Sequence, residues 1–263
     1  MTVETSSIYL SDPIEKASYG SHPKPLKKNK RHKDNWKAWI PLLEQVSFQN
    51  CVQVLLWDVA ANQFIYSVDK RGVAGHNAAL YLGDHGTVFF SSNFHPLFHT
   101  ASHNLLYKGY DYLLQNKHEV YNTIVNADFV CLKSKGYYMH CLLQSKCVET
   151  DIDGNPTLIL NFRHDITHLK KENTVNMVIA TPTCRKWWNY NFVHHSLQEV
   201  RPFSKQEKKV LACLSTGQAS TDIAKKLCLS PHTVDTHRRH LLYKTNCLNT
   251  TGMITYAKLV SLL

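Results

Sequence analysis

Several features that would point to a class of protein are missing from this sequence. No run of apolar residues reaches the roughly 20 that a membrane-spanning helix needs. The first residues lack the basic-then-apolar pattern of a secretory signal peptide. The eight cysteines include no CxxC pair, and scattered cysteines of this kind are typical of reduced, mostly buried thiols. We therefore expect a cytoplasmic protein without a membrane partner.

The sequence also lacks the residue arrangements of common catalytic sites. No nucleophile motif, phosphate-binding loop or pair of catalytic carboxylates stands out, so we do not expect an enzyme. His95, His99 and His103 have the four-residue spacing of some metal-binding helices, but no acidic residue or cysteine nearby completes a site. We predict partly exposed histidines and no metal. We interpret residues 151–154, which are rich in Asp, as a hairpin turn rather than a calcium loop.

Charge is plentiful but unevenly distributed. The 263 residues carry a formal net charge of +10, and a chain of this length allows about two domains. Residues 201–263 have a net charge of +7, whereas residues 34–200 have a net charge of −1. This balance is expected if only the C-terminal part meets DNA phosphates. Residues 1–34 are basic and interrupted by proline, and we predict a mobile arm that is either simply solvated or adds non-specific DNA affinity.

The segment Ser230–Lys244 has the clearest pattern in the chain. Ser230 can cap the first turn of a helix, and Pro231 suits the first helical position because its missing N–H would have no partner there. The apolar positions on one side of this helix are Val234, Leu241 and Leu242. The other side is basic, and a helix with these two faces suits the major groove of DNA.

Three further helices are predicted around this segment. Ser204 and Glu207 form a capping-box pattern at the start of the first. Ser220 can cap a second, short helix, and the residues CLS then make the tight turn of a helix-turn-helix. Residues 250–263 form the last helix. The predicted unit at 201–263 is therefore all-α and four-helical.

The stretches FSKQEKKVL, GQASTDIAKKLCLS and PHTVDTHRRHLLYKTNC resemble the LuxR/FixJ-type DNA-binding domain. Asp235 stands where members often carry Lys, and Asn246 stands where they often carry Gly. The resemblance implies a sequence-specific transcription regulator that binds double-stranded DNA. Thr236 and Arg239 are expected to face base edges. Asp235 departs from the usual base-reading pattern, and we expect it either to accept a bond from cytosine or to reject unfavourable bases. The expected phosphate contacts are Thr233, His237, Arg238, Lys225, Lys226 and Lys244.

We expect two copies of the chain on DNA, since one recognition helix reads only a few base pairs. The last helix has more apolar residues than a thin bundle can cover, so we expect Val260 to contact the second subunit, with Ile254 as a less certain contact. The alternative interpretation is a signalling or scaffold module whose helix-turn-helix serves protein contacts, which the basic recognition helix disfavours.

Residues 35–172 predict a second domain of the α+β class. Two strands, several helices and three antiparallel strands follow one another, with hairpin turns between the later strands. This order resembles the PAS sensor fold, in which a five-stranded sheet and helices surround a small core pocket. The flavin-binding Asn-Cys-Arg motif of that family is absent, and no haem-binding histidine can be assigned, so a cofactor cannot be named.

The resemblance implies a pocket between the sheet and the helices of residues 75–115. We predict an apolar lining suited to a small organic molecule, although the same residues would also serve a filled hydrophobic core. The predicted lining residues are Val54, Leu56, Tyr137, Met139, Cys141, Leu158, Leu160 and Phe162. Residues 173–200 form an aromatic-rich connector, which we expect to pack on the sheet, on the DNA-binding unit or on a second subunit.

Overall fold

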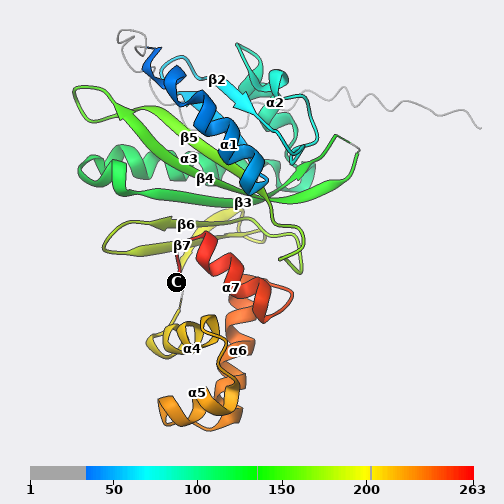
Figure 1. Ribbon diagram of the computed structural model, residues 1–263, viewed down its shortest axis with the longest axis vertical. Coiled ribbons are helices and arrows are strands. Elements are labelled where there is room, and N and C mark those ends of the chain that lie inside the picture. Colours follow the sequence, from blue (N-terminus) through cyan, green and yellow to red (C-terminus); the bar gives the residue numbers. More distant parts are fainter. Residues whose placement is uncertain (1–33, 135, 202) are drawn as a thin grey trace, which may run out of the picture.

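The computed structural model describes residues 34–134, 136–201 and 203–263. An antiparallel sheet carries helices on both faces, and a four-helix unit lies against one of them (Figure 1). The α+β class predicted from the sequence is confirmed, as is the all-α character of the C-terminal unit. Residues 1–33 of the predicted basic arm lie outside the described residues. Its last residue, Asp34, is described and begins the first 3-10 helix.

Along the described part of the chain, a first helical segment, two strands, a group of helices, six strands and four helices follow one another. The strands are β1 (Gln53–Asp58), β2 (Gln63–Val68), β3 (Ile124–Leu132), β4 (Tyr138–Thr150), β5 (Pro156–Asp165), β6 (Asn176–Ala180), β7 (Arg185–Asn191) and β8 (Ser196–Val200). The α-helices are α1 (Ile40–Asn50), α2 (Gly86–Ser92), α3 (His99–Gln115), α4 (Lys205–Ser215), α5 (Ser220–Leu227), α6 (Pro231–Thr245) and α7 (Thr250–Leu259). Short 3-10 helices are η1 (Asp34–Trp39), η2 (Ala78–Tyr81), η3 (Pro96–Phe98) and η4 (Lys117–Asn122).

The sheet has eight strands in the order β2-β1-β5-β4-β3-β6-β7-β8. The five strands expected from residues 35–172 are β1 to β5, and β6 adds to them by pairing with β3. The segment 173–200, which we separated as a connector, is therefore a continuation of the sheet through β6, β7 and β8. Its aromatic residues pack in two directions: Trp188 joins the core beneath α3, whereas Trp187 lies 5.8 Å from Phe203 of the helical unit, measured between ring centroids.

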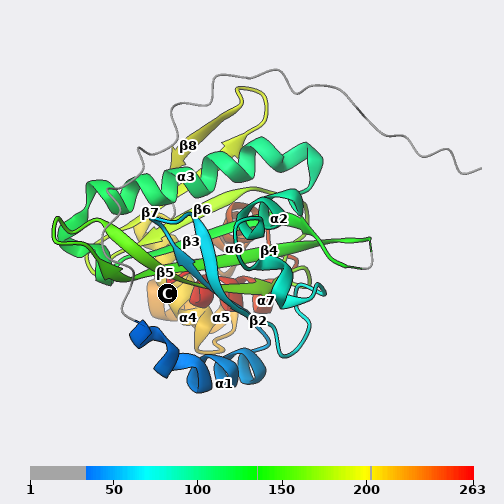
Figure 2. The same cartoon turned by 90° about the horizontal axis from the view of Figure 1, so that it is seen from above.

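The two faces of the sheet are covered by different helices. Successive side chains of a strand point to opposite faces, so odd-numbered residues of β5 such as Ile159 face α2 and α3. Even-numbered residues of β5 such as Phe162 face α1. The helical unit lies on this second face, beside α1, where Leu142 of β4 joins its core. Figure 2 shows α3 and α1 on opposite sides of the sheet.

Helix α3 approaches the sheet closely at Gly109. A Cβ atom built on Gly109 would lie 2.6 Å from Val125 Cγ1 and 3.3 Å from Met177 Sδ. Glycine is a poor helix former, and its presence here is explained by this packing.

Within the described residues, no helix combines the length and apolar character that crossing a bilayer requires.

The helical unit begins with the caps that the sequence indicates. Ser204 Oγ accepts from the N–H of Glu207 at 3.1 Å, and Glu207 Oε2 accepts from the N–H of Ser204 at 2.7 Å, which is a complete capping box. Ser230 Oγ accepts from the N–H of Thr233 at 3.0 Å and starts α6. The expected cap at Ser220 is wrong, because the cap of α5 is Ala219 and Ser220 is the first helical residue.

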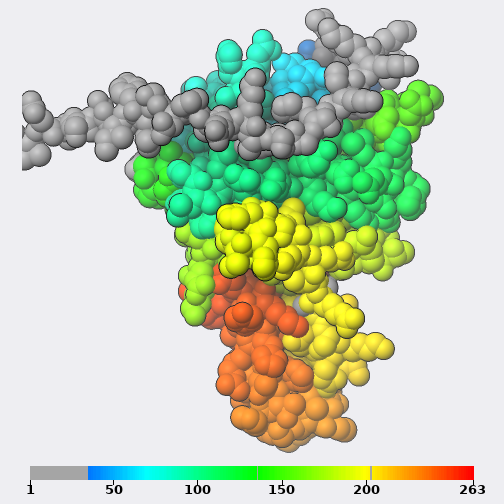
Figure 3. Space-filling model, turned by 180° about the vertical axis from the view of Figure 1, so that it is seen from behind, coloured from blue at the N-terminus to red at the C-terminus, as the bar shows by residue number. Residues whose placement is uncertain are grey.

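Helix α7 attaches the helical unit to the sheet. Val260, which follows α7 directly, is fully buried in the cluster of apolar residues shared by the unit and the sheet. The prediction that Val260 contacts a second subunit is therefore wrong, since the surplus apolar surface of this helix is covered by the chain's own sheet. In Figure 3 the helical unit forms a narrow projection, with its orange residues farthest from the broad sheet domain and the red residues of α7 nearest to it.

Candidate DNA-binding surface and internal cavity

The exposed face of α6 carries the residues expected to read base edges. Arg239 is exposed, and its Nη2 donates to Thr236 Oγ1 at 3.1 Å. Thr236 Oγ1 in turn donates to the carbonyl of His232, one turn earlier, at 3.0 Å. These two side chains therefore lie together on the outer surface of α6. Thr233 and His237 are partly exposed on the same helix, and Thr233 Oγ1 lies 2.8 Å from Ser230 Oγ.

Asp235 and Arg238 of α6 connect three helices through hydrogen bonds. Ser220 Oγ of α5 donates to Asp235 Oδ1 at 2.8 Å, and Arg238 Nη1 donates to the same Ser220 oxygen at 2.7 Å. Arg238 Nη2 donates to Thr250 Oγ1 of α7 at 3.1 Å. In this structure both side chains hold the unit together, which gives Asp235 a physical reason to stand where related sequences often carry Lys.

Lys244 is likewise engaged within the unit. Its Nζ lies 2.7 Å from Oε2 of Glu207, the residue that closes the capping box of α4. Burial raises the pKa of Glu207, but the hydrogen bonds from Lys244 and Ser204 outweigh it and lower the pKa below its ordinary value. Lys225 and Lys226, by contrast, are exposed near the end of α5, and in the described part of the chain neither forms a salt bridge.

A buried polar cluster joins the helical unit to the sheet. Asp128 of β3 accepts from Lys170 Nζ at 2.8 Å and from Tyr256 Oη of α7 at 2.5 Å. It also accepts from the backbone and side-chain amides of Asn176 at 3.1 and 3.0 Å. Burial would raise the pKa of Asp128, but Lys170 and His140 outweigh it and hold the pKa well below its ordinary range. Asp128 is therefore an ionised carboxylate with a full set of donors.

No prediction from the sequence included this cluster, although one signal was available. Asp128 begins the stretch DFVCLK and lies in the middle of β3, and a carboxylate at a buried strand position needs partners. Its main partners, Lys170 and Tyr256, are 42 and 128 residues away in the chain. No local pattern could have identified them.

A second polar contact crosses from the sheet to α7 at Gln144. Its Nε2 donates to the carbonyl of Leu259 at 2.7 Å and to Asn126 Oδ1 at 2.9 Å. Its Oε1 lies 2.8 Å from Nε2 of His164. Burial lowers the pKa of His164 to about 4, so this imidazole is neutral near pH 7 and can donate to Gln144.

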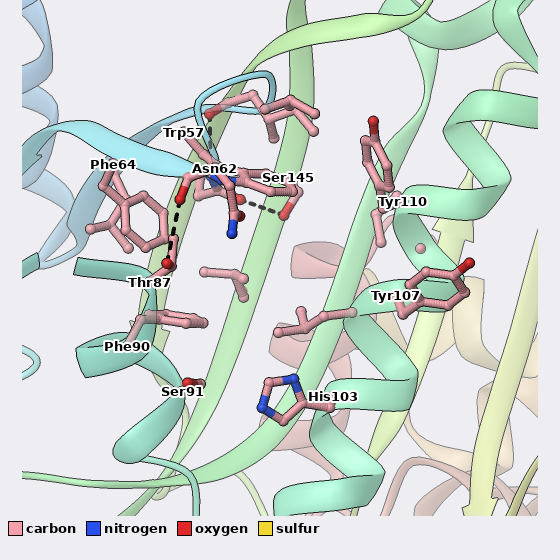
Figure 4. A pocket seen from close by; sticks show the side chains of 18 of the residues that line it. Trp57, Asn62, Phe64, Thr87, Phe90, Ser91, His103, Tyr107, Tyr110 and Ser145 are labelled. Atoms are coloured by element: carbon pink, nitrogen blue, oxygen red, sulfur yellow. Dashed lines mark hydrogen bonds between the residues drawn. The ribbon is translucent and has the colours of Figure 1, made fainter. Parts of the chain in front are cut away.

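A cavity of about 780 Å³ lies on the opposite face of the sheet, between the strands and the helices α2 and α3. Figure 4 shows Thr87 and Phe90 of α2 facing His103 and Tyr107 of α3 across it. Its volume is within the range of about 300–1,000 Å³ typical of small-molecule pockets, and its lining is mostly apolar. The lining residues from the sheet include Leu55, Trp57, Val125, Leu143, Ser145, Ile159 and Asn161.

A few polar groups interrupt the apolar wall. Ser145 Oγ donates to Asn161 Oδ1 at 2.6 Å. Burial, with a smaller contribution from His99, lowers the pKa of His103, so its imidazole is neutral at pH 7. Burial is also the main reason that the pKa of Tyr110 is raised to about 12. The cavity thus offers neutral hydrogen-bonding groups and no ionised side chain in its wall at neutral pH.

None of the eight residues predicted to line the cavity lies in its wall. Five of them lie on the opposite face of the sheet, in the clusters beside α1: Val54, Leu56, Leu158, Leu160 and Phe162. Met139 and Cys141 lie on the correct face but outside the cavity, and Tyr137 is exposed. This prediction failed because β1 and β5 are covered on both faces of the sheet. Apolar residues therefore occupy successive positions, and no alternation in the sequence shows which side chains face the cavity.

Of the three histidines with four-residue spacing, His99 and His103 lie in α3 and His95 lies shortly before it. His95, His99 and His103 are all partly exposed, as expected. His103 also lines the cavity, and its ring centroid lies 5.3 Å from that of Phe94. Across the residues that the structure describes, no group of three or more His, Cys, Asp or Glu side chains could hold a metal ion.

Comparison with known proteins finds a family that matches the C-terminal unit. Residues 201–257 match the family described as bacterial regulatory proteins, luxR family. The oxygen regulatory protein NreC of Staphylococcus epidermidis is 30% identical over 125 residues, which are 46% of this chain and 56% of NreC. The uncharacterized transcriptional regulatory protein YxjL of Bacillus subtilis is 36% identical over 63 residues, 24% of this chain and 29% of YxjL. The chain thus spans about half the length of NreC and less of YxjL.

Solved structures of VqmA give a weaker likeness over most of the chain. The Vibrio cholerae VqmA dimer, described as a LuxR-type receptor without its target DNA, is 18% identical with a TM-score of 0.30, and the likeness covers 82% of this chain and 86% of that one. A phage VqmA–DPO complex is 14% identical with a TM-score of 0.30, over 86% and 88% of the two chains. At these TM-scores the likeness defines neither the fold nor the function of this chain.

Proposed function

We propose that this protein is a sequence-specific DNA-binding transcription regulator, and that its sheet domain is a PAS-like sensor for a small molecule. The observation that carries the first part is the exposed basic face of α6 in a capped helix-turn-helix whose sequence matches the luxR family of regulatory proteins. The relatives that match this unit are regulators rather than enzymes, and we propose no catalytic role.

We assign the proposed DNA contacts according to whether each side chain is exposed or is bonded within the helical unit. Arg239 and Thr236 are the proposed base readers, because they share the exposed surface of α6. Lys225 and Lys226 are the proposed phosphate contacts, supported by their exposure. Thr233 and His237 are further contacts to the backbone. Asp235, Arg238 and Lys244 contribute chiefly by holding the helices in position, since each is bonded within the unit.

The sensor role rests on the cavity and on its position relative to α7. Val125 and Ser145 line the cavity, whereas their chain neighbours Asn126 and Gln144 point to the opposite face and are bonded to each other there. Gln144 also bonds the last residue of α7, Leu259. A small molecule that shifts β3 or β4 would therefore move residues that hold the helical unit. It acts only if it binds the DNA-competent arrangement differently from the other.

A homodimer remains part of this proposal, because paired recognition helices supply the specificity that one helix lacks. Its contacts are not those of Val260, which is buried within the chain. A regulator of this kind works beside the bacterial chromosome, which supports the cytoplasmic assignment.

Fluorescence anisotropy with the full chain tests the proposal. Duplexes enriched from a random library should bind at least about a thousandfold more tightly than random DNA of equal length, with affinity falling as salt rises. A chain that binds enriched and random duplexes equally, with no salt dependence, would instead support the scaffold alternative. Changes in the melting temperature of the protein with a library of small apolar molecules would identify ligands of the cavity.

A further inference from the structure

Three polar side chains lie deep in the sheet domain without satisfying their hydrogen bonds. Arg163 of β5 is 1% exposed, and Gln53 of β1 and Tyr81 of η2 are fully buried. Among the residues that the structure describes, no well-aligned partner bonds Nε or Nη2 of Arg163 or Oε1 of Gln53. The Tyr81 hydroxyl lies near the guanidinium without a well-aligned bond: burial raises the pKa of this phenol, and Arg163 offsets part of that rise. Buried polar groups are normally paired, so a cluster of this kind calls for an explanation.

The cluster lies one step beyond the end of the cavity. Ile159 and Asn161 line the cavity, and Arg163 is the next residue of β5 on the same face. In the sheet register Arg163 stands between Gln53 of β1 and Leu143 of β4, and Leu143 itself lines the cavity. Unoccupied donors and acceptors thus continue the row of side chains that forms the cavity floor.

One aromatic side chain lies next to both the cavity and the guanidinium. Phe90 of α2 lines the cavity, and the Cζ of Arg163 lies 5.9 Å from the centroid of its ring. The same Cζ lies 5.5 Å from the ring centroid of Tyr81. Phe90 therefore contacts both the cavity and the guanidinium, and a change in its side-chain torsion would open a path from the cavity toward Arg163.

The charge of Arg163 is not balanced by a carboxylate. Within the described ranges it takes part in no salt bridge, and nearby Asp165 is instead paired with Lys133 at 3.3 Å. The π faces of Tyr81 and Phe90 offset part of the cost of burying a cation. Burial lowers the pKa of Arg163, but Cys131, Tyr81 and Cys141 outweigh it and raise the pKa above its ordinary value. Arginine keeps its proton in proteins, and a carboxylate would pair with this buried cation more strongly than thiols and a phenol do.

We propose that Arg163, with Tyr81 and Gln53, is an anion-binding subsite beside the cavity, and that the cavity takes a small, largely apolar carboxylate. The apolar body would occupy the cavity, and the carboxylate would pass Phe90 to accept from Nε and Nη2 of Arg163, the fork that suits a planar anion. The Tyr81 hydroxyl would donate to the same group. This inference rests on the proposed sensor function only in naming the kind of molecule that the cavity binds.

Isothermal titration of the full chain with 2-naphthoate and with the neutral isostere 2-naphthamide tests the subsite. The unaltered chain should bind 2-naphthoate at least about tenfold more tightly, as expected for hydrogen bonds to a charged group. Arg163→Met should abolish this preference while leaving the binding of 2-naphthamide unchanged, which also reports that the cavity is intact. Arg163→Lys, which keeps the charge but loses the fork, should retain part of the preference.

The inference is overturned if the unaltered chain fails to bind 2-naphthoate, if it binds the two probes equally, or if the preference survives in Arg163→Met. The comparison of probes on the unaltered chain holds even if that variant does not fold. DNA affinity without a probe is measured in parallel. A chain that prefers 2-naphthoate but binds no DNA would support the subsite and contradict the proposed function.

Discussion

The hydroxyl of Tyr256 lies 2.5 Å from Oδ2 of Asp128, so the last helix of the C-terminal unit is bonded directly to a strand of the sheet. Both side chains are buried. Burial, the negative charge of Asp128 and this hydrogen bond all raise the pKa of Tyr256 well above its ordinary value. The contact therefore connects the two parts of the chain through an ionised acid and a neutral phenol.

Replacing Asp128 should destabilise the whole chain. Asp128→Ala leaves the ammonium group of Lys170 buried, and among the described residues the carbonyl of Thr245 is then its remaining hydrogen-bond acceptor. We expect a loss of about 3–5 kcal/mol in the free energy of unfolding, as for other broken buried pairs. Urea denaturation measures it. The double variant Asp128→Ala with Lys170→Met should recover part of the loss, and additive losses would show that the two groups do not act as a pair.

The same cluster predicts the limits of stability with pH. The pKa of Asp128 in the folded chain lies below its ordinary value of 3.8, so its contribution to stability is complete above pH 3.8 and is lost as pH falls further. The pKa of Tyr256 in the folded chain lies above its ordinary value of 10.0, so its contribution to stability is complete below pH 10.0 and is lost as pH rises further. The stability difference between the unaltered chain and Tyr256→Phe should thus be constant at neutral pH and shrink above pH 10.0; a difference that grows there would contradict this assignment.

Two exposed basic residues should affect DNA binding in different ways. Arg239→Ala should cost about 1–3 kcal/mol at the cognate sequence and relax specificity there, because a base contact is lost. Lys226→Ala should weaken cognate and random DNA similarly and reduce the salt slope by about 1, because only a phosphate contact is lost. Anisotropy titrations across salt concentrations measure both. Equal losses of cognate and random affinity in Arg239→Ala would show that it does not read bases.

Lys244 provides a contrast to these two residues. Lys244→Met removes the ion pair with Glu207 at 2.7 Å, so the main effect should be on stability rather than on DNA. The Lys244 side chain is partly exposed, and we expect a loss of about 1 kcal/mol. Thermal unfolding of the full chain measures it. Unchanged stability with a lowered salt slope would return Lys244 to the phosphate contacts that the sequence suggested.

The packing of α3 can be tested at Gly109. Gly109→Ala favours the helix by propensity, but its Cβ would lie 2.6 Å from Val125 Cγ1. The helix would have to move from the sheet, so we expect a net loss of about 1–3 kcal/mol. Denaturant unfolding measures it, and Lys108→Ala in the same helix is the matched control. A gain in stability would show that the contact relaxes easily.

The sequence by itself determined the C-terminal unit in most of its local detail. Caps at Ser204 and Ser230, the left-handed end at Asn246 and the apolar spacing of α6 are local signals, because each depends on residues within a few positions of one another. The α+β class of the sheet domain followed from hairpin turns in the same way. The match of residues 201–257 to the luxR family agrees with this local analysis.

Tertiary structure decided which surfaces these elements cover. Val54, Leu55 and Leu56 are all fully buried, so no alternation in the chain could show that Leu55 faces the cavity and its neighbours face α1. The apolar residues near the end of α7 require a cover, but the sequence does not say whether a second subunit or the chain's own sheet supplies it. The sheet extends through β6 to β8 because β6 pairs with β3, and the two are joined only by contacts between residues about 50 positions apart.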